Sequence, residues 1–200
     1  MKRLFIAVDV ELSKEFQMLT QQLQFDLRND EIVWVKNGLQ HLTLRFLGET
    51  PDSKIEAIAN ILSTLANTTS AFDLQLDKIG IFGSKYAPTT LWCGFSEFSS
   101  FKNMFQKLEK ELYQIGFHEN YGNFVPHITI GRIKKMENKK RFWETITKQQ
   151  PQFLQTIPVN HLKLIQSKLT NDGPIYKTLY AITLQNAPEQ TLHSGTENTK

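Results

Sequence analysis

The sequence predicts an α+β fold with two similar lobes, each an antiparallel sheet with helices on one side. Two observations lead to this prediction. Short β-rich segments alternate with amphipathic helical segments along the 200 residues, with about eight strands and about four helices. In addition, a strand–helix–strand–strand–helix unit recurs around two similar tetrapeptides, His41-Leu42-Thr43-Leu44 and His127-Ile128-Thr129-Ile130.

The first quarter of the chain is predicted to contain three strands and one helix. The helix has leucine and phenylalanine at helical spacing and Ser13 as its N-cap. In the first strand, alternate residues from Leu4 to Val8 should face the core, with Phe5 and Ala7 on the opposite face. The expected elements are a strand at 3–9, a helix at 11–28, a strand at 32–35, an Asn-Gly turn at 37–38 and a strand at 41–48.

The middle of the chain is predicted to form two helices around a pair of strands. Pro51 suits the first turn of a helix because its missing N–H is not needed there, and Gly116 suits the end of the second helix. The expected elements are a helix from 51 to 65, a strand at 72–76, a loop at 80–88, a strand at 90–95 and a helix at 98–115.

The last third should contain the second tetrapeptide strand, a short helix and three further strands. A basic run at 134–141 is interpreted as the solvated start of that helix, and contact with a phosphate backbone is the alternative. Residues 1–185 are expected to form a single bilobal domain, and residues 186–200 a disordered tail because they lack an apolar pattern. The expected elements are a loop at 117–125, a strand at 127–132, a helix at 138–149, strands at 152–157, 159–167 and 175–184, and a turn at 171–174.

Composition excludes several classes of protein. The hydrophobic content of 40% is ordinary for a globular chain, and a net charge of +3 is too small to indicate nucleic-acid binding by itself. Cys93 is the only cysteine, which excludes an internal disulfide and argues against a cysteine-based metal site. The apolar run at 4–8 is too short for a signal peptide or a membrane span. We therefore expect a cytoplasmic monomer with no membrane partner.

The two tetrapeptides each separate polar from aliphatic side chains. In a β-strand the side chains alternate between faces, so His41 and Thr43 should point one way and the adjoining leucines the other. His127 and Thr129 should likewise separate from their isoleucines. Each strand would then offer an imidazole and a hydroxyl on one face. The alternative is that these are two half-buried strands whose polar faces merely meet solvent.

Two such strands that face one another would bring two imidazoles to one point. Because the usual pKa of histidine is about 6.5, one ring can accept a proton while the other donates one. Hydrolysis of a phosphodiester needs both steps, since water must lose a proton and the leaving alkoxide must gain one. Thr43 and Thr129 would hydrogen-bond the equatorial oxygens, and a cation would stabilise the developing charge.

Arg45 and Arg132 are the candidate cations. Arg45 shares the parity of His41 and should reach the cleft directly. Arg132 has the opposite parity from His127, so it reaches the cleft only if the strand bulges or ends at Gly131, which glycine in a strand favours. A surface ion pair is the alternative for either arginine.

A metal site is the competing use of the histidines. None of the five is paired at the spacing of metal ligands, and no acidic cluster flanks the tetrapeptides, so no metal is expected. His118, His161 and His193 are interpreted as surface or structural residues. No cofactor is expected either, because the sequence has no glycine-rich phosphate loop and no dinucleotide-binding motif.

These residues resemble the 2H phosphoesterase superfamily, named for two His-x-Thr/Ser motifs, and within it the RNA 2′,3′-cyclic phosphodiesterase (2′-5′ RNA ligase) family. The resemblance runs from residue 2 to about residue 184. Gly38-Leu39-Gln40 departs from the family's usual Glu-Asn-Leu, and the residues before Pro126 are atypical, which could alter substrate contacts. The matching segments are the opening strand at 3–8, Trp34-Val35, the first signature at 41–49, Leu91-Trp92 with Gly94, the second signature at 126–132, and Ser167 and Tyr176 in the terminal hairpin.

The resemblance implies a bilobal fold with two pseudo-symmetric lobes, each an antiparallel sheet with helices on its outer face, and an active-site cleft between them. It also implies the hydrolysis of an RNA or nucleoside 2′,3′-cyclic phosphate to the 2′-phosphate, without a metal. It implies that His41 donates a proton to the departing 3′-oxygen and that His127 is the base that accepts a proton from water. The residues implied in phosphate binding are Thr43, Thr129 and Arg132, and further candidates for substrate binding are Phe5, Arg45, Ser167 and Tyr176. For Phe5 the alternative to stacking on a base is core packing.

The residues alone leave several alternatives open. They are symmetric with respect to which histidine is the acid and which is the base. An RNA-end-binding protein, or a reversible 2′-5′ RNA ligase acting on cyclic-phosphate termini, would use the same site. A small metabolite such as a nucleotide cyclic phosphate or a 2′,5′-oligonucleotide is a third candidate substrate. The expected partner is therefore an RNA or nucleotide with a 2′,3′-cyclic phosphate end.

Overall fold

A computed structural model of the chain describes residues 1–118, 123–171 and 173–186. Within these ranges it contains nine strands, four α-helices and one short 3₁₀ turn. The strands are β1 (Lys2–Asp9), β2 (Glu31–Trp34), β3 (His41–Thr50), β4 (Phe72–Gly83), β5 (Pro88–Phe95), β6 (His127–Lys135), β7 (Gln155–Val159), β8 (His161–Thr170) and β9 (Gly173–Thr183). The helices are α1 (Lys14–Asp26), α2 (Ile55–Asn67), α3 (Ser99–Gln114) and α4 (Lys139–Lys148), and the 3₁₀ turn is η1 (Asp52–Lys54).

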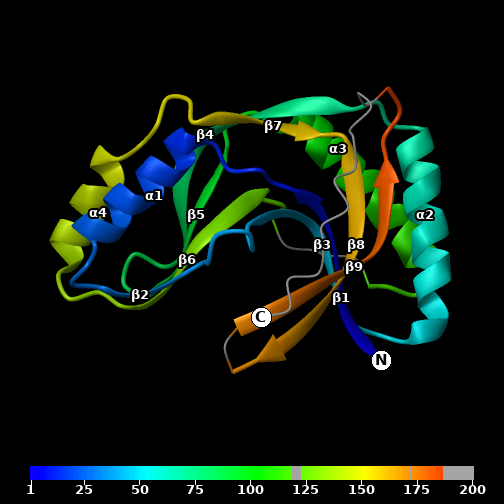
Figure 1. Cartoon of the computed structure of the whole chain (residues 1–200), viewed down its shortest axis with the longest axis horizontal. Coiled ribbons are helices and arrows are strands. Elements are labelled where there is room, and N and C mark those ends of the chain that lie inside the picture. The colour runs from blue at the N-terminus through cyan, green and yellow to red at the C-terminus, as the bar shows by residue number, and fades with distance from the viewer. Residues whose placement is uncertain (119–122, 172, 187–200) are drawn as a thin grey trace.

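The nine strands form one strongly curved antiparallel sheet with the order β7-β4-β5-β6-β3-β1-β8-β9 (Figure 1). Strand β2 lies off this path and pairs with β6. The sheet has two halves that meet where β3 pairs with β6, at Leu42 and Ile128. This single pairing joins the two lobes that the sequence predicts, so the expected α+β fold is confirmed.

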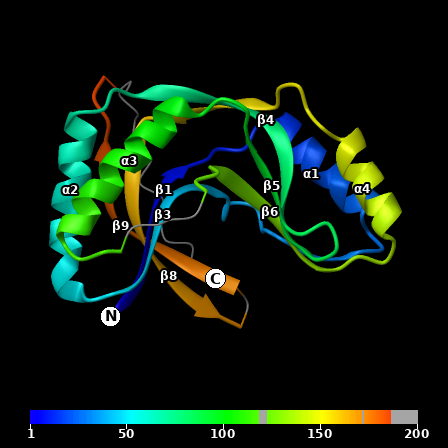
Figure 2. The same ribbon diagram turned by 180° about the vertical axis from the view of Figure 1, so that it is seen from behind.

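The helices lie on the outer face of each half of the sheet (Figures 1 and 2). Helices α2 and α3 cover the half built from β3, β1, β8 and β9, whereas α1 and α4 cover the other half. Asp26 ties α1 to α4, because its carboxylate accepts a hydrogen bond from Gln149 Nε2 at 3.0 Å and its carbonyl accepts one from Arg141. The chain therefore crosses between lobes after β1, and its first helix supports the lobe that contains β6.

The first strand is buried on both faces, with the side chains divided as predicted. Leu4, Ile6 and Val8 lie in the large core, and Phe5 and Ala7 form a small second cluster on the opposite face. Full burial of each large aliphatic side chain stabilises the fold by about 1.5–3 kcal/mol. Strand β1 is thus packed on both sides, and the face that carries Phe5 and Ala7 is held firmly in place.

The predicted helix boundaries follow from local chemistry. Ser13 caps α1, and its Oγ accepts a hydrogen bond from the Phe16 N–H at 3.1 Å. Pro51 precedes the turn η1, which continues directly into α2. Gly116 has a φ of +83° just after α3, the left-handed conformation that terminates many helices.

The predicted loop at 80–88 is wrong, because β4 and β5 continue as a long hairpin that leaves only 84–87 as its turn. Gly80 does not make a turn: it faces the Trp92 indole across the strand pair, and a Cβ there would lie 2.0 Å from the ring. Gly83 has a φ of +99°, and it alone of the two glycines needs the conformational freedom of a turn.

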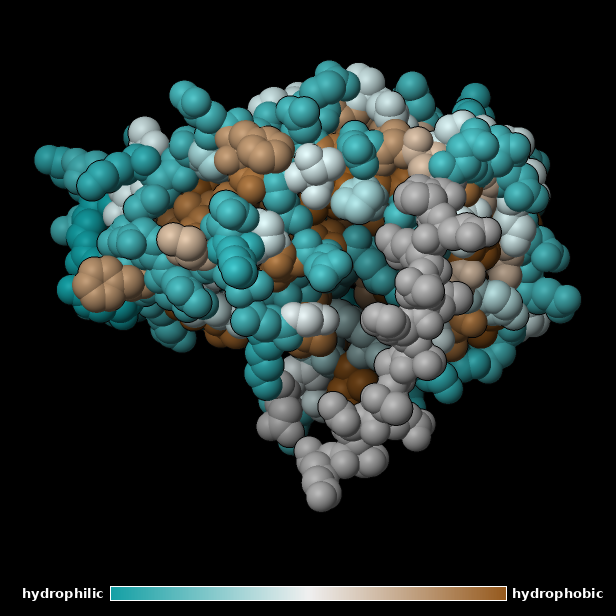
Figure 3. All heavy atoms as spheres, turned by 45° about the horizontal axis from the view of Figure 1, so that its top comes forward, coloured by the Kyte–Doolittle hydropathy of each residue, from teal (hydrophilic) through white to brown (hydrophobic). Residues whose placement is uncertain are grey.

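Other observations bear on the environment of the chain. No helix in the described part of the structure is long and apolar enough to cross a membrane. Burial raises the pKa of the Cys93 thiol to about 12, so this cysteine is a poor nucleophile. The face shown in Figure 3 is mainly hydrophilic, with apolar side chains scattered among polar ones. The predicted tail lies outside the described residues apart from Asn186.

Candidate active site

The tetrapeptide strands β3 and β6 lie together at the middle of the sheet and line a cavity of about 620 Å³. His41 and Thr43 enter this cavity from β3, and His127 and Thr129 enter it from β6. The aliphatic residues between them are buried in the core on the other face. The predicted separation of polar and aliphatic faces is therefore confirmed in both strands, and the two imidazoles share one cavity.

Each imidazole is oriented by one backbone carbonyl. His41 Nδ1 lies 2.9 Å from the Leu39 carbonyl oxygen, and His127 Nδ1 lies 2.8 Å from that of Val125. A carbonyl oxygen only accepts hydrogen bonds, so Nδ1 carries the hydrogen in both rings. The Nε2 atom of each ring is then the one that exchanges a proton, and both carbonyls lie two residues before the histidine that they orient.

Aromatic side chains enclose both rings. The His41 ring centroid lies 4.9 Å from that of Phe5 and 5.3 Å from that of Tyr176. The His127 ring centroid lies 4.7 Å from that of Phe82, which meets it edge to face. These contacts bury much of each imidazole and limit its rotation.

Burial lowers the pKa of both histidines below the usual value, but their neighbours differ. For His41, burial lowers the pKa most, the Leu39 hydrogen bond and the Asp9 carboxylate raise it, and the charge of Arg132 lowers it. For His127, burial again lowers the pKa most, the Val125 hydrogen bond raises it, and the charges of Arg132 and His41 lower it further. A protonated imidazole is therefore better supported at His41, where a carboxylate is near, than at His127.

Arg132 reaches the cavity through a bulge in β6. Trp92 of β5 pairs with Thr129 and Leu91 pairs with Gly131, so Ile130 is an extra residue in β6. The extra residue reverses the alternation of side chains and turns Arg132 into the cavity, where its Nη1 donates to Thr90 Oγ1 at 3.2 Å. The bulge predicted at Gly131 is confirmed.

Arg45 lies outside the cavity, so the prediction from its parity is wrong. Strand β3 also bulges, because Ala7 pairs with Thr43 and Ile6 with Arg45, which leaves Leu44 as the extra residue. The Arg45 guanidinium instead forms an ion pair with Glu109, with 2.6 Å between its Nε and the carboxylate. The bulge places Phe46 at the cavity, in the position that Arg132 occupies on β6.

The remaining predicted residues Phe5, Ser167 and Tyr176 do line the cavity, although contact with substrate stays a prediction. Phe46 and Thr90 were missed. Phe46 is hidden from sequence reasoning by the bulge, which no local pattern announces, and Thr90 matters only through its bond to Arg132. Phe82 was also missed, because it falls within the wrongly predicted loop.

The remaining histidines lie apart from this cavity or outside the described residues. His161 Nδ1 bonds to the Asn160 side chain at 2.8 Å, and neither His118 nor His161 lines the cavity. His193 lies outside the described residues. Within the described residues, no group of three or more His, Cys, Asp or Glu side chains is arranged to hold a metal ion.

Sequence comparisons give related proteins over most of the chain. A model of the 2′-5′ RNA ligase superfamily matches residues 35–171. The RNA 2′,3′-cyclic phosphodiesterase of Thermotoga maritima is 34% identical over 180 residues, which cover 89% of this chain and 93% of the relative. The protein of the same name from Methanocaldococcus jannaschii is 29% identical over 177 residues, which cover 88% and 98%.

Solved structures show the same fold. A protein of Thermus thermophilus superposes with a TM-score of 0.75 and 25% identity, covering 91% of this chain and 97% of that one. Crystalline E. coli LigT complexed with 3′-AMP superposes with a TM-score of 0.70 and 22% identity, covering 92% and 98%. These likenesses and the matches in sequence confirm the resemblance expected from the two His-x-Thr motifs.

Proposed function

The chain belongs to the 2′-5′ RNA ligase superfamily, and from this premise we propose that it hydrolyses the 2′,3′-cyclic phosphate of RNA ends or nucleotides to the 2′-phosphate, without a metal. One observation carries the proposal. His41 and His127 line the same cavity, with Nδ1 fixed to a carbonyl in each and Nε2 left for proton exchange. A matched pair of this kind is what in-line displacement at phosphorus requires.

In the proposed reaction, neutral His127 accepts a proton on Nε2 from a water molecule whose oxygen attacks phosphorus. The bond between phosphorus and the 3′-oxygen breaks on the opposite side. Protonated His41 donates its Nε2 proton to that departing oxygen, which becomes the 3′-hydroxyl. The product is the 2′-phosphate, and the two histidines have exchanged protonation states, so a proton must return through solvent before the next turnover.

The surroundings of the two rings support this order of acid and base. Asp9 lies opposite His41 in the β1–β3 pairing, and its charge favours the protonated ring. Arg132 favours the neutral form of both rings, and at His127 the charge of His41 acts in the same direction. Because the guanidinium acts on both rings, the carboxylate is what distinguishes them, and the proton donor is the histidine beside it.

Thr43, Thr129 and Arg132 are proposed to bind the phosphate. The threonine hydroxyls enter the cavity beside the two imidazoles, on the same strand faces. The Arg132 guanidinium is already held by Thr90 Oγ1, so it needs little reorganisation when negative charge develops on the equatorial oxygens. A charge-assisted hydrogen bond of this kind is stronger than a neutral one.

Ligation is the second candidate, because the matching family model is that of 2′-5′ RNA ligases. Joining a 5′-hydroxyl to a cyclic phosphate to form a 2′-5′ linkage is the same displacement, with an RNA hydroxyl in place of water. Both reactions would therefore use His41 and His127 in the same roles. They differ in product and in dependence on the concentration of 5′-hydroxyl RNA.

The function is tested by product identification. The protein is incubated with a nucleoside 2′,3′-cyclic phosphate and with cyclic-phosphate-ended RNA, with and without EDTA. We expect the 2′-phosphate from both substrates, at a rate that EDTA does not change. Formation of the 3′-phosphate, abolition of turnover by EDTA, or turnover of neither substrate would contradict the proposal, and accumulation of joined RNA would favour ligation.

A further inference from the structure

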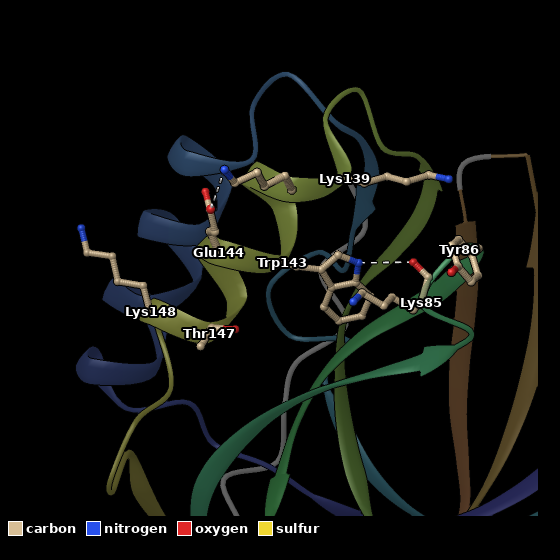
Figure 4. Close-up of a pocket in the computed structure, with 8 residues that line it drawn as sticks. Lys85, Tyr86, Lys139, Trp143, Glu144, Thr147 and Lys148 are labelled. Atoms are coloured by element: carbon tan, nitrogen blue, oxygen red, sulfur yellow. Dashed lines mark hydrogen bonds and ion pairs between the residues drawn. The ribbon is translucent and has the colours of Figure 1, made fainter.

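A second hollow, of about 720 Å³, lies between α4 and the turn of the β4–β5 hairpin (Figure 4). Lys85 and Tyr86 line it from the turn, and Lys139, Lys140 and Lys148 line it from the helix. We call these residues, with Trp143 and Glu144, the basic hollow. None of them lines the cavity that holds the two histidines.

The basic hollow carries a concentrated positive charge. Its four lysines outnumber its single glutamate by three, which equals the formal net charge of the whole chain. All four lysines are exposed, and the one acidic partner, Glu144, lies 3.9 Å from Lys140 across one helical turn. An exposed pair of this kind contributes little to stability, so this ion pair does not account for the cluster of lysines.

Aromatic rings are interleaved with these lysines. Tyr86 is 77% exposed, and the Lys139 ammonium lies 5.5 Å from the centroid of its ring. Trp143 lies between α4 and the hairpin, and its Nε1 donates to the Lys85 carbonyl at 3.3 Å. A tyrosine this exposed adds little to the core, so one face of its ring is free to stack on a flat ligand.

The hairpin turn that carries Tyr86 is fixed in place. The Ser84 hydroxyl accepts hydrogen bonds from the N–H groups of Tyr86 at 3.3 Å and Ala87 at 3.0 Å. The same turn is closed by the hydrogen bond from Ser84 N to the Ala87 carbonyl at 3.2 Å. The aromatic ring is therefore presented by an ordered turn, which reduces the entropy lost on binding.

The hairpin connects this surface to the catalytic cavity. Phe82 lines that cavity and touches the His127 ring, and Lys85 follows only three residues later. Three extended residues span at most about 10 Å. A chain whose end lies at the two histidines therefore needs only a short path along the hairpin to reach the basic hollow.

We propose that the basic hollow binds single-stranded RNA upstream of the cyclic-phosphate end, with lysines on its phosphates and Tyr86 stacked on a base. This inference rests on the proposed function for the position of the RNA end. Lysines interleaved with exposed aromatic rings are the chemistry by which proteins hold single strands without reading their sequence. The protein would then bind RNA more tightly than a mononucleotide, while the chemical step stays the same for both.

The test compares two substrates in wild-type and variant proteins. The substrates are a nucleoside 2′,3′-cyclic phosphate and a cyclic-phosphate-ended RNA of about 12 nucleotides, within the length that such surfaces bind. One variant carries Lys85→Ala, Lys139→Ala and Lys140→Ala, and a second carries Tyr86→Ala alone. The matched control carries Lys102→Ala, Lys107→Ala and Lys110→Ala, three exposed lysines of α3 on the other lobe.

We expect the triple-lysine variant to raise KM for the RNA by about tenfold or more at low salt, with kcat unchanged. The slope of log KM against log salt concentration should fall by roughly 2 in this variant. Each phosphate contact of a single strand contributes about 0.7 to that slope, and three lysines are removed. Tyr86→Ala should raise the same KM by about tenfold, as for one lost stacked base. Kinetics with the mononucleotide, and both substrates with the control, should not change.

Binding of fluorescein-labelled RNA of the same sequence, followed by anisotropy, decides the proposal independently of turnover. If the wild-type protein hydrolyses neither substrate, the proposed function fails, and this measurement still tests the hollow. Equal RNA affinity for wild-type and triple-lysine proteins would overturn the inference, and so would an equal loss in the α3 control. If the triple-lysine protein loses binding to phosphatidylserine vesicles but keeps its RNA binding, the hollow binds lipid and the inference is also overturned.

Discussion

At the scale of single residues, the site depends on two rings held alike and surrounded differently. His41 and His127 each give their Nδ1 hydrogen to a carbonyl two residues earlier, so tautomer and orientation are the same. Their charged neighbours differ, because Asp9 lies beside His41 whereas Arg132 acts on both rings. In the proposed mechanism, this difference makes His41 the acid and His127 the base.

Asp9→Asn tests this assignment through the pH dependence of kcat/KM. The burial of both rings lowers their pKa, so we expect a bell-shaped profile whose two limbs both lie below about pH 6.5. Loss of the Asp9 charge destabilises protonated His41 and lowers its pKa further. The alkaline limb, which reports the acid, should therefore move to lower pH, while the acidic limb of the base His127 stays in place.

Asp52→Asn is the matched control for this variant. The Asp52 side chain is 61% exposed, as that of Asp9 is, and each carboxylate pairs with a lysine. Its removal should leave both limbs unchanged. A shift of the acidic limb alone in Asp9→Asn would contradict the assignment, because it would make His41 the base and His127 the acid.

The sequence predicts the residues of the site correctly where side chains alternate regularly between the two faces of a strand. The prediction fails where a bulge interrupts this alternation. The histidine and threonine of each tetrapeptide line the cavity as expected. Arg45 does not, because the extra residue Leu44 in β3 reverses the alternation beyond it. The equivalent bulge at Ile130 was expected only because Gly131 follows it, and β3 has no glycine at that point.

At the scale of elements, the β4–β5 hairpin positions the second imidazole. The Trp92 indole lies across the strand pair where Gly80 and Gly94 leave room, and a Cβ on Gly94 would lie 2.7 Å from the ring. From this place its centroid is 6.1 Å from that of His127, and Phe82 packs against both rings. The hairpin is thus a rigid wall of the cavity.

Gly80→Ala should disturb this wall. A Cβ at this position lies 2.0 Å from the indole, so the ring must move, and overpacking of this kind costs about 1–3 kcal/mol. We expect a lower melting temperature and a lower kcat, measured by thermal unfolding and by turnover. Lys78→Ala, at an exposed position of the same strand, is the control and should change neither.

A double-variant comparison separates this contact from general strand damage. The cost of Gly80→Ala should be smaller when Trp92 is already Phe, since contacting residues couple. Strictly additive effects on stability would rule out the contact as the cause.

Element positions follow from sequence where the cause is local. The Ser13 cap, the Pro51 start and the apolar stripes of the helices are properties of neighbouring residues, and these elements are found close to where they are predicted. The length of β4 is not such a property. Gly80 leaves room for the indole of Trp92 on the neighbouring strand. A glycine that predicts a turn therefore lies inside a strand.

At the scale of the whole molecule, the site lies at the junction of two similar half-sheets. From the junction outward the strands run β6-β5-β4-β7 on one side and β3-β1-β8-β9 on the other. Each half contributes one histidine, one threonine and a bulge directly after that threonine. The bulges deliver different residues, Arg132 on one side and Phe46 on the other, so the cavity has a cationic side and an aromatic side.

The α+β class and the two lobes can be predicted from the recurrence of one pattern around each His-x-Thr. Two features could not be predicted. The half-sheets are joined through the Leu42–Ile128 pairing, and α1 supports the lobe opposite to that of its preceding strand. Both depend on pairings between residues far apart in sequence, which periodicity and propensity do not encode.

The most direct test of a shared acid–base pair is the turnover of His41→Ala and His127→Ala on a 2′,3′-cyclic nucleotide. His161→Ala is the control, since this ring is bonded to Asn160 and does not line the cavity. We expect each of the first two variants to lose about 10²–10⁴-fold in kcat while it unfolds near the wild-type temperature, and the control to keep full activity. Wild-type turnover by a folded His41→Ala or His127→Ala protein would contradict the account.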